Sequence, residues 1–384
     1  MNVPAAAGAA QLFNERFRRV PPLTTFAPGR VNLIGGPDYN EVFTLPFALG
    51  VGVYTAAARR DDRRLVVTSR QEGGGPAELD IDALQPGSVH GWAAYPAGVA
   101  WALREAGYLG GGADIAVDAD LPAGAGLSSS AALECSVALA LTELYDVPVP
   151  RRELAALARR AENEFAGVPT GIMDQLAAML GQAGHALLLD CRTGTETMVP
   201  LDPAAAGLAL LVIDTRARHA VGDGQYGGRR QACEQAAAQL GVRALRDVAG
   251  DPGAPARLAD PALRRVAEHV IAENARALRV AELLQAGDPV AAGQLLTVSH
   301  RSLSYRFRMS WPEADAAVEA AVDIGAIGAR MTGGGFGGSV VALFPADREA
   351  AVRSAVSRRF ARHRWLQPRY LPAVPSDGAR RIGA

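Results

Sequence analysis

Hydrophobic positions along the first half of the chain follow two spacings, one typical of strands and the other of helices. Short runs of β-branched or alternating apolar residues predict strands, and they occur at 31–36, 51–58, 64–70, 113–121, 185–191 and 208–215. Apolar residues spaced three and four apart predict helices over 129–145 and 151–167. The first half therefore alternates strands with helices.

Longer helical patterns fill the second half of the chain. Apolar residues at helical spacing cover 229–241, 261–287 and 312–326. The chain then closes with strands on either side of a glycine-rich run, within 328–344. Strands and helices in this arrangement predict a two-lobed α/β or α+β protein.

The segment LDPAAAG, residues 201–207, separates the two halves. It lies directly before a strand pattern and lacks a helical or strand pattern of its own. We place the domain boundary here, which predicts a first domain over 1–205 and a second over 206–384.

Composition narrows the class of partner. The chain has 384 residues, of which 49% are hydrophobic and 21% charged, values that suit two globular domains. Its formal net charge of -1 gives no basic field to attract nucleic acid or an anionic membrane. No apolar run is long enough to span a bilayer, and no signal peptide is recognised. Small molecules are therefore the expected partners, for a protein that is a monomer or a weak dimer.

Cysteine and lysine usage excludes several chemistries. The three cysteines, at 135, 191 and 233, lie far apart and form no CxxC pair, which argues against disulfides or a zinc site and favours a reducing cytoplasm. All 39 residues of the Lys+Arg count are arginines. Schiff-base chemistry, the Walker A lysine and the protein-kinase lysine are therefore excluded.

The stretch LPAGAGLSSSAALE, residues 121–134, is the strongest candidate for a phosphate site. A predicted strand enters a turn, and a helix begins among the serines. Glycines in the turn allow positive φ and close backbone approach. The serines would cap the helix and leave its first N–H groups pointing at the turn, where these donors and the positive end of the helix dipole attract phosphate without a side-chain cation. The predicted phosphate cradle comprises Gly124, Ala125, Gly126, Leu127, Ser128, Ser129 and Ser130.

This stretch resembles the phosphate-binding motif of the GHMP kinase superfamily. APGRVNLIGG at 27–36 resembles the N-terminal motif of that superfamily, and MTGGGFGGSVVAL at 331–343 resembles its C-terminal glycine-rich motif. Two further segments, 161–192 and 219–234, are similar to galactokinases. The resemblance implies an α+β fold of two lobes with the active site in the cleft between them. It also implies a sugar 1-kinase that uses ATP and Mg²⁺.

The resemblance assigns roles to the reacting groups. Asp174, in GIMDQ, matches the catalytic base, which takes the proton of the attacking sugar hydroxyl. Arg30 matches the arginine beside that base and stabilises developing charge. Ser130 and Glu162 match two magnesium ligands, a hydroxyl and a carboxylate of the hard-oxygen type that Mg²⁺ prefers.

The resemblance also assigns residues to the sugar. Asp38, Gly171 and Tyr226 match positions that hold it. The run 333–338 is too rich in glycine for a stable strand interior. We therefore expect it to line the site near the phosphates and the sugar, with Gly334 and Gly335 contacting the substrate.

Two departures from the galactokinase pattern bear on the substrate. Galactokinases carry GRVNLIGEHTDYNGG, whereas this chain reads GRVNLIGGPDYNEV, so that one residue is missing and Gly36-Pro37 replaces Glu-His-Thr. The glutamate and histidine bind sugar hydroxyls in galactokinases, and their loss predicts weaker galactose binding. Glu41 stands where the family has glycine and is a candidate for partial replacement.

The second departure lies in HRSLSYRFRMSWPEAD, residues 300–315, where arginines replace expected acids. Arginine is well suited to bind phosphate, so that Arg306 or Arg308 is a candidate for a distal phosphate. The leading hypothesis is a sugar 1-kinase for a longer or phosphorylated sugar, of the heptose or octose phosphate type. The alternatives are an authentic galactokinase and a non-catalytic sensor of sugar and ATP.

Overall fold

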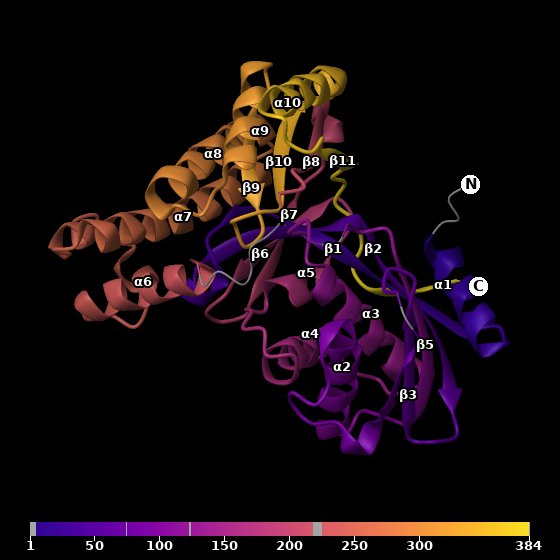
Figure 1. The fold of residues 1–384 in the computed structure, drawn as a ribbon. Coiled ribbons are helices and arrows are strands. Elements are labelled where there is room, and N and C mark those ends of the chain that lie inside the picture. Colours follow the sequence, from indigo (N-terminus) through magenta and orange to yellow (C-terminus); the bar gives the residue numbers. More distant parts are fainter. Residues whose placement is uncertain (1–4, 74, 123, 218–224, 384) are drawn as a thin grey trace.

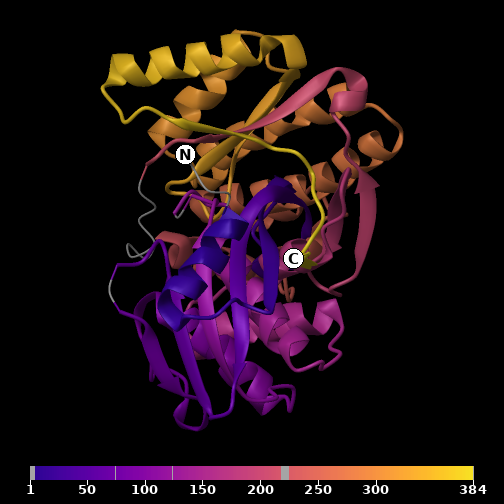
Figure 2. The same ribbon diagram turned by 90° about the vertical axis from the view of Figure 1, so that its right-hand side faces the viewer.

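The computed structural model describes residues 5–73, 75–122, 124–217 and 225–383. The chain forms two lobes, each with its own sheet and helices (Figure 1). Figure 2 shows the two lobes from the side.

The first lobe contains a mixed sheet in the order β12-β1-β2-β5-β3-β4, to which the β6–β7 hairpin is joined through β2. Among the strands of this sheet in the described part of the chain, β3 and β5 pair in parallel and the other pairs are antiparallel. The strands are β1 (Leu23–Gly35), β2 (Phe43–Arg60), β3 (Arg64–Ser69), β4 (Ala77–Asp80), β5 (Gly112–Ala119), β6 (His185–Asp190), β7 (Glu196–Pro200) and β12 (Arg380–Ile382).

Helices cover both faces of this sheet. Successive residues of a strand point to opposite faces, and on β2 Ala56 and Ala58 contact α1 (Ala5–Phe17), whereas Ala57 belongs to the main core. The core face carries α2 (Ala94–Glu105), α3 (Ser129–Leu144), α4 (Arg151–Arg160) and α5 (Met173–Leu180). Because both faces are covered, β5 is buried along nearly its whole length, including Asp114 and Asp118.

The second lobe has an antiparallel sheet in the order β11-β8-β10-β9. Its strands are β8 (Leu208–Asp214), β9 (Gly328–Thr332), β10 (Ser339–Pro345) and β11 (Arg369–Pro372). Helices α7 and α8 lie side by side, as do α9 and α10 (Figure 1). The helices are α6 (Gln225–Gln239), α7 (Pro261–Gln285), α8 (Pro289–Ser302), α9 (Pro312–Asp323) and α10 (Glu349–His363).

The elements differ from the sequence prediction at several points. The helix predicted over 151–167 is interrupted, because α4 ends at Arg160 and Ala161–Phe165 forms a π-helical turn. The chain leaves the first sheet after β7 and enters the second with β8, so that the predicted boundary at 205/206 lies between the two sheets. The second unit is not continuous to residue 384, however, because β12 pairs with β1 in the first sheet.

Within the described residues, none of the helices is both long and apolar enough to cross a membrane.

Candidate active site

The centre of the site is an ion pair between Arg30 on β1 and Asp174 in the first turn of α5. The Nε and Nη2 atoms of Arg30 donate to the Oδ1 and Oδ2 atoms of Asp174, each at 2.8 Å. The Arg30 side chain is only 6% exposed, whereas that of Asp174 is 23% exposed. The two residues expected to act together are therefore in contact, and the carboxylate remains accessible.

The predicted phosphate turn lies directly against this pair. Arg30 donates from Nη1 to the carbonyl oxygen of Gly126 at 2.8 Å and from its backbone N to that of Leu127 at 3.1 Å. Gly124 and Gly126 have φ of 72° and 71°, as expected for glycines that make a turn. The turn thus brings the N-terminus of α3 beside Asp174.

The predicted serine capping is wrong in one respect. Ser128 occupies the N-cap position of α3 in a left-handed conformation, but its side chain makes no capping hydrogen bond. Its hydroxyl donates to the Oδ2 atom of Asp174 instead. The first N–H groups of α3 consequently have no side-chain cap from Ser128, which leaves them available to an anion.

Glu162 lies in the π-helical turn and is buried, with 3% of its surface exposed. It accepts hydrogen bonds from Ser130, from Thr170 Oγ1 at 2.9 Å and from Gln175 Nε2 at 2.8 Å. Burial raises the pKa of its carboxyl group, and these hydrogen bonds oppose the rise. The structure therefore brings the two predicted magnesium ligands, Ser130 and Glu162, into contact.

Glu134 is a site neighbour that the sequence interpretation missed. It lies one turn after Ser130 on α3, is fully buried, and accepts from Gln175 Nε2 at 3.2 Å, so that Gln175 bridges Glu134 and Glu162. Burial, followed by the charge of Glu162, raises the pKa of Glu134 well above its usual value. Its sequence signal was an acid four residues after Ser130 within an apolar helix, a spacing that places both on one face.

Asp38 and Gly171 meet beside the ion pair. The site of a Cβ atom on Gly171 would lie 1.7 Å from the Oδ2 atom of Asp38, so that any larger residue here would have to displace the Asp38 carboxylate. Burial, and next the charge of Asp174, raise the pKa of Asp38 to about 6, while the backbone N–H of Met173 donates to the carboxylate and opposes the rise. Two of the predicted sugar-binding positions are therefore adjacent to each other and to Asp174.

The glycine-rich loop between β9 and β10 closes one side of the phosphate turn. A Cβ atom on Gly333 would lie 2.8 Å from the carbonyl oxygen of Gly126, and the Ser339 hydroxyl donates to the carbonyl oxygen of Ala125 at 2.7 Å. Gly335 packs against Met309 so closely that a Cβ atom would lie 2.2 Å from its Cγ atom. The loop, which contains Gly334, thus lies beside the phosphate turn.

Three further residues were predicted to bind the substrate, and Glu41 was a candidate beside them. Arg306 and Arg308 are both exposed, and Arg306 lies 3.8 Å from Glu268 of α7, so that its charge already has a partner. The charge of Arg308 adds to burial in lowering the pKa of Arg229. Tyr226 lies in α6, but its side chain is outside the described residues. Glu41 pairs with arginines, as described below.

Matches to known protein families cover more than half of the chain. The description "GHMP kinases N terminal domain" matches residues 94–182, and "GHMP kinases C terminal" matches residues 280–362. "Galactokinase galactose-binding signature" matches residues 11–59, a range that includes Arg30 and Asp38 despite the altered loop.

Comparisons with individual proteins also match this chain to galactokinases. The chain is 48% identical to a galactokinase of Streptomyces coelicolor, with 100% of both chains covered. It is 45% identical to a galactokinase of Mycobacterium tuberculosis, covering 92% of this chain and 97% of the relative. The structure of Lactococcus lactis galactokinase in complex with galactose aligns with a TM-score of 0.91 at 29% identity, covering 97% and 98% of the two chains.

A heptose 1-phosphate kinase of Bacteroides thetaiotaomicron aligns with a TM-score of 0.64 at 16% identity, covering 94% of this chain and 99% of that protein. That likeness extends to the fold alone. The predicted resemblance and the predicted two-lobed α+β fold are confirmed. The relatives favour the galactokinase alternative over the heptose or octose phosphate hypothesis.

Proposed function

The chain belongs to the GHMP kinases as an ATP-dependent, galactokinase-like sugar kinase, and from that premise we propose that it phosphorylates the anomeric hydroxyl of galactose. The single observation that carries this proposal is the placement of Asp38 and Gly171 beside the Arg30–Asp174 pair. An acceptor held by Asp38 would lie next to the accessible carboxylate of Asp174.

In the proposed reaction, Asp174 accepts the proton of the anomeric hydroxyl as its oxygen attacks the γ-phosphorus of ATP. The bond between the γ-phosphorus and the bridging oxygen breaks, and ADP leaves. Arg30 holds both oxygens of Asp174 by its bidentate contact, and the Ser128 hydroxyl bonds one of them. These contacts support an oriented carboxylate. The N-terminus of α3 would bind phosphate oxygens.

The residues around Ser130 fit a magnesium ion by their chemistry. The Ser130 hydroxyl and the Glu162 carboxylate would provide oxygen ligands, and few protein ligands are needed because Mg²⁺ keeps several waters. When bound, Mg²⁺ neutralises phosphate charge. Gln175 and Thr170 would orient the Glu162 carboxylate through their hydrogen bonds.

Initial rates with ATP and Mg²⁺ on a panel of sugars test the proposal. The panel comprises galactose, arabinose, a heptose phosphate and an octose phosphate. We expect galactose to give the highest kcat/KM, with galactose 1-phosphate and ADP formed in equal amounts. A higher kcat/KM for a sugar phosphate than for galactose would support the hypothesis of a longer or phosphorylated sugar. Turnover of no sugar at all would favour the non-catalytic sensor, a hypothesis that the intact Arg30–Asp174 pair argues against.

We also propose that the protein acts in the reducing cytoplasm, where its three free thiols would stay reduced.

A further inference from the structure

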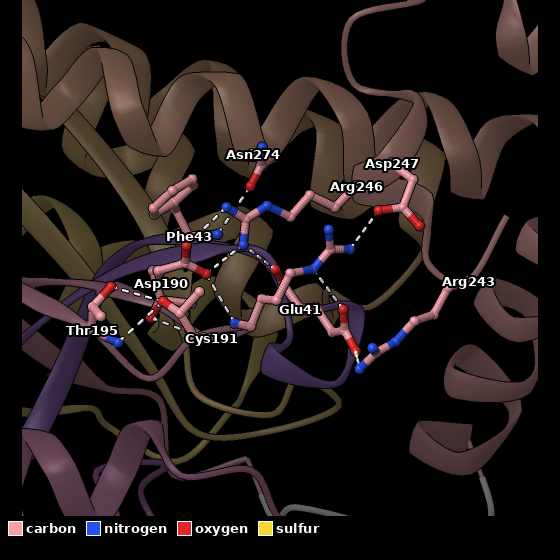
Figure 3. Close-up of polar contacts among 12 residues, drawn as sticks. Glu41, Phe43, Asp190, Cys191, Thr195, Arg243, Arg246, Asp247 and Asn274 are labelled. Atoms are coloured by element: carbon pink, nitrogen blue, oxygen red, sulfur yellow. Dashed lines mark hydrogen bonds and ion pairs between the residues drawn. The ribbon is translucent and has the colours of Figure 1, made fainter.

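The loop 36–42 joins β1 to β2 and contains Asp38. Helix α7 of the second lobe holds the chain on both sides of this loop. The Oε1 atom of Glu273 accepts from the backbone N of Gly35 at 3.4 Å, and Oδ1 of Asn274 accepts from the backbone N of Phe43 at 2.9 Å (Figure 3 shows the Asn274 contact). The ends of the loop are therefore fixed by adjacent residues of one helix.

Glu41 holds the middle of the loop. Its Oε2 atom accepts from Arg192 Nε at 2.7 Å and its Oε1 atom from Arg243 Nη2 at 2.6 Å, while its carbonyl oxygen accepts from Arg246 Nη1 at 2.8 Å (Figure 3). Its own N–H donates to the carbonyl oxygen of Asp38 at 2.9 Å. Both the side chain and the backbone of Glu41 are engaged, and the backbone is bonded directly to Asp38.

Glu41 also adopts an unfavourable backbone conformation. Its φ of 58° lies in the left-handed region, which residues other than glycine rarely occupy. A side chain that makes two ion pairs supplies a physical reason for keeping glutamate in this conformation.

The arginines around Glu41 are themselves fixed by acids. Arg192, in the turn after β6, donates from Nη2 to Asp247 Oδ1 at 2.6 Å. Arg246 donates from Nη2 to Asp190 Oδ2 at 2.9 Å and lies 4.3 Å from the ring centroid of Phe43. The hydrogen bond from Arg246 is the main reason why the pKa of Asp190 is lowered. We call the group the loop clamp, and it comprises Glu41, Asp190, Arg192, Arg243, Arg246 and Asp247.

The loop clamp joins the two lobes. Glu41, Asp190 and Arg192 belong to the first lobe, whereas Arg243, Arg246 and Asp247 lie between α6 and α7 in the second. Its three carboxylates match its three guanidinium groups in number, so that every charge has an opposite partner. Of these side chains, Asp190 and Arg246 are the most buried, at 13% and 16% exposure.

We propose that the loop clamp holds Asp38 in its sugar-binding position, which makes Glu41, Arg192 and Arg246 positioning residues for the acceptor sugar. The inference rests on the proposed function, because that function assigns Asp38 to the sugar. Glu41 thus acts on the sugar through the loop backbone, in place of the direct contact suggested by the sequence, because its carboxylate is occupied by two arginines.

Kinetics of Glu41→Gln and Arg192→Ala test the proposal. Each substitution removes part of the ion pairing without changing the residue Asp38 itself. We expect the KM for galactose to rise about three- to tenfold, as for the loss of one or two partly exposed ion pairs. The KM for ATP should stay within about twofold. Among the described residues, no hydrogen bond joins the phosphate turn to the loop clamp. Arg246→Lys keeps the charge but loses the bidentate fork and should give an intermediate rise.

The matched control is Arg359→Ala. Arg359 also makes two ion pairs, with Glu319 and Asp323, and its side-chain exposure of 28% is close to the 32% of Arg192. Neither KM should change in this variant. Equal increases in both KM values for the clamp variants, or a lower melting temperature with unchanged KM values, would show a purely structural role and overturn the proposal.

Hydrogen–deuterium exchange distinguishes failure of this inference from failure of the proposed function. Without any sugar, the amides of residues 38–43 should exchange faster in Glu41→Gln than in the wild-type protein. Exchange at the amides of α10 should be the same in both. If the wild-type protein does not phosphorylate galactose but the exchange result holds, the function is wrong and the loop clamp stands. If exchange in 38–43 does not change, the loop clamp is wrong whatever the sugar.

Discussion

Gly171 and Asp38 are in such close contact that a Cβ atom on the glycine would lie 1.7 Å from the carboxylate. Gly171→Ala should therefore displace Asp38, because overpacking of this kind costs about 1–3 kcal/mol. We expect the KM for galactose to rise about fivefold or more, with little change in the KM for ATP. Steady-state kinetics with each substrate varied in turn measure both.

Gly250→Ala is the control for that substitution, because no atom lies within 4 Å of the added carbon. An unchanged KM for galactose in Gly171→Ala would mean that Asp38 does not bind the sugar.

Asp174→Asn tests the proposed base. The substitution keeps the shape of the side chain but removes its capacity to accept a proton, so that kcat should fall about 100- to 10,000-fold. Binding of a non-hydrolysable ATP analogue, measured by calorimetry, should persist, because the phosphate turn is formed by backbone groups. Wild-type kcat in this variant would refute the assignment.

Glu162→Gln tests the magnesium site. Replacing the carboxylate by an amide removes a charged ligand, and we expect the Mg²⁺ concentration for half-maximal activity to rise about tenfold or more. Glu164→Gln, two residues away, is the control, since Glu164 is exposed and pairs with Arg160. If both variants respond alike to Mg²⁺, Glu162 does not bind the metal.

The two exposed arginines, Arg306 and Arg308, provide a test of substrate length. On the galactose proposal, the double variant Arg306→Ala/Arg308→Ala should keep its KM for galactose within about twofold, because galactose has no anionic group for them to bind. A selective rise in the KM for a sugar phosphate that the wild-type protein uses well would instead support the longer-substrate hypothesis.

His269 predicts a specific dependence of stability on pH. It is fully buried on α7, with Nδ1 2.8 Å from the Ser302 hydroxyl, and burial lowers its pKa from 6.5 to about 4. The unfolded chain therefore takes up this proton first as the pH falls. Above pH 6.5, the neutral form of His269 contributes about 3 kcal/mol to the free energy of unfolding. This contribution is lost as the pH falls from 6.5 to about 4.

Urea unfolding between pH 7 and pH 4 measures this contribution. Between pH 7 and pH 4, the free energy of unfolding should fall less in His269→Gln than in the wild-type protein. The difference should be most of the about 3 kcal/mol given above. His363→Gln, at the exposed end of α10, should behave as the wild type does. Equal losses in the wild type and His269→Gln would contradict the prediction.

The sequence predicted those parts of the site whose chemistry is local. The phosphate turn was recognisable because glycines and serines occupy the positions where a strand enters a helix, and the structure has positive φ at Gly124 and Gly126. Asp174, Arg30, Ser130 and Glu162 were assigned through family motifs, and the structure brings them together.

Features that depend on tertiary contacts were not predictable in this way. The π-helical turn at Ala161–Phe165 has the same apolar spacing as an α-helix, so that periodicity did not reveal it. The role of Ser128 was misassigned because its partner, Asp174, is 46 residues away. Glu41 looked like a sugar ligand because of its position in the loop, whereas its partners, Arg192 and Arg243, are 151 and 202 residues distant.

The pairing of β12 with β1 has a consequence for synthesis and engineering. Thr24, Thr25 and Phe26 near the start of the chain find their partners at Ile382, Arg381 and Arg380, within its last few residues. On the ribosome, this edge of the first sheet must therefore keep unpaired backbone groups until residues 380–382 have been synthesised. Deletion of residues 380–382 would remove β12 and leave the backbone groups of β1, the first strand to be synthesised, without their partners at this edge.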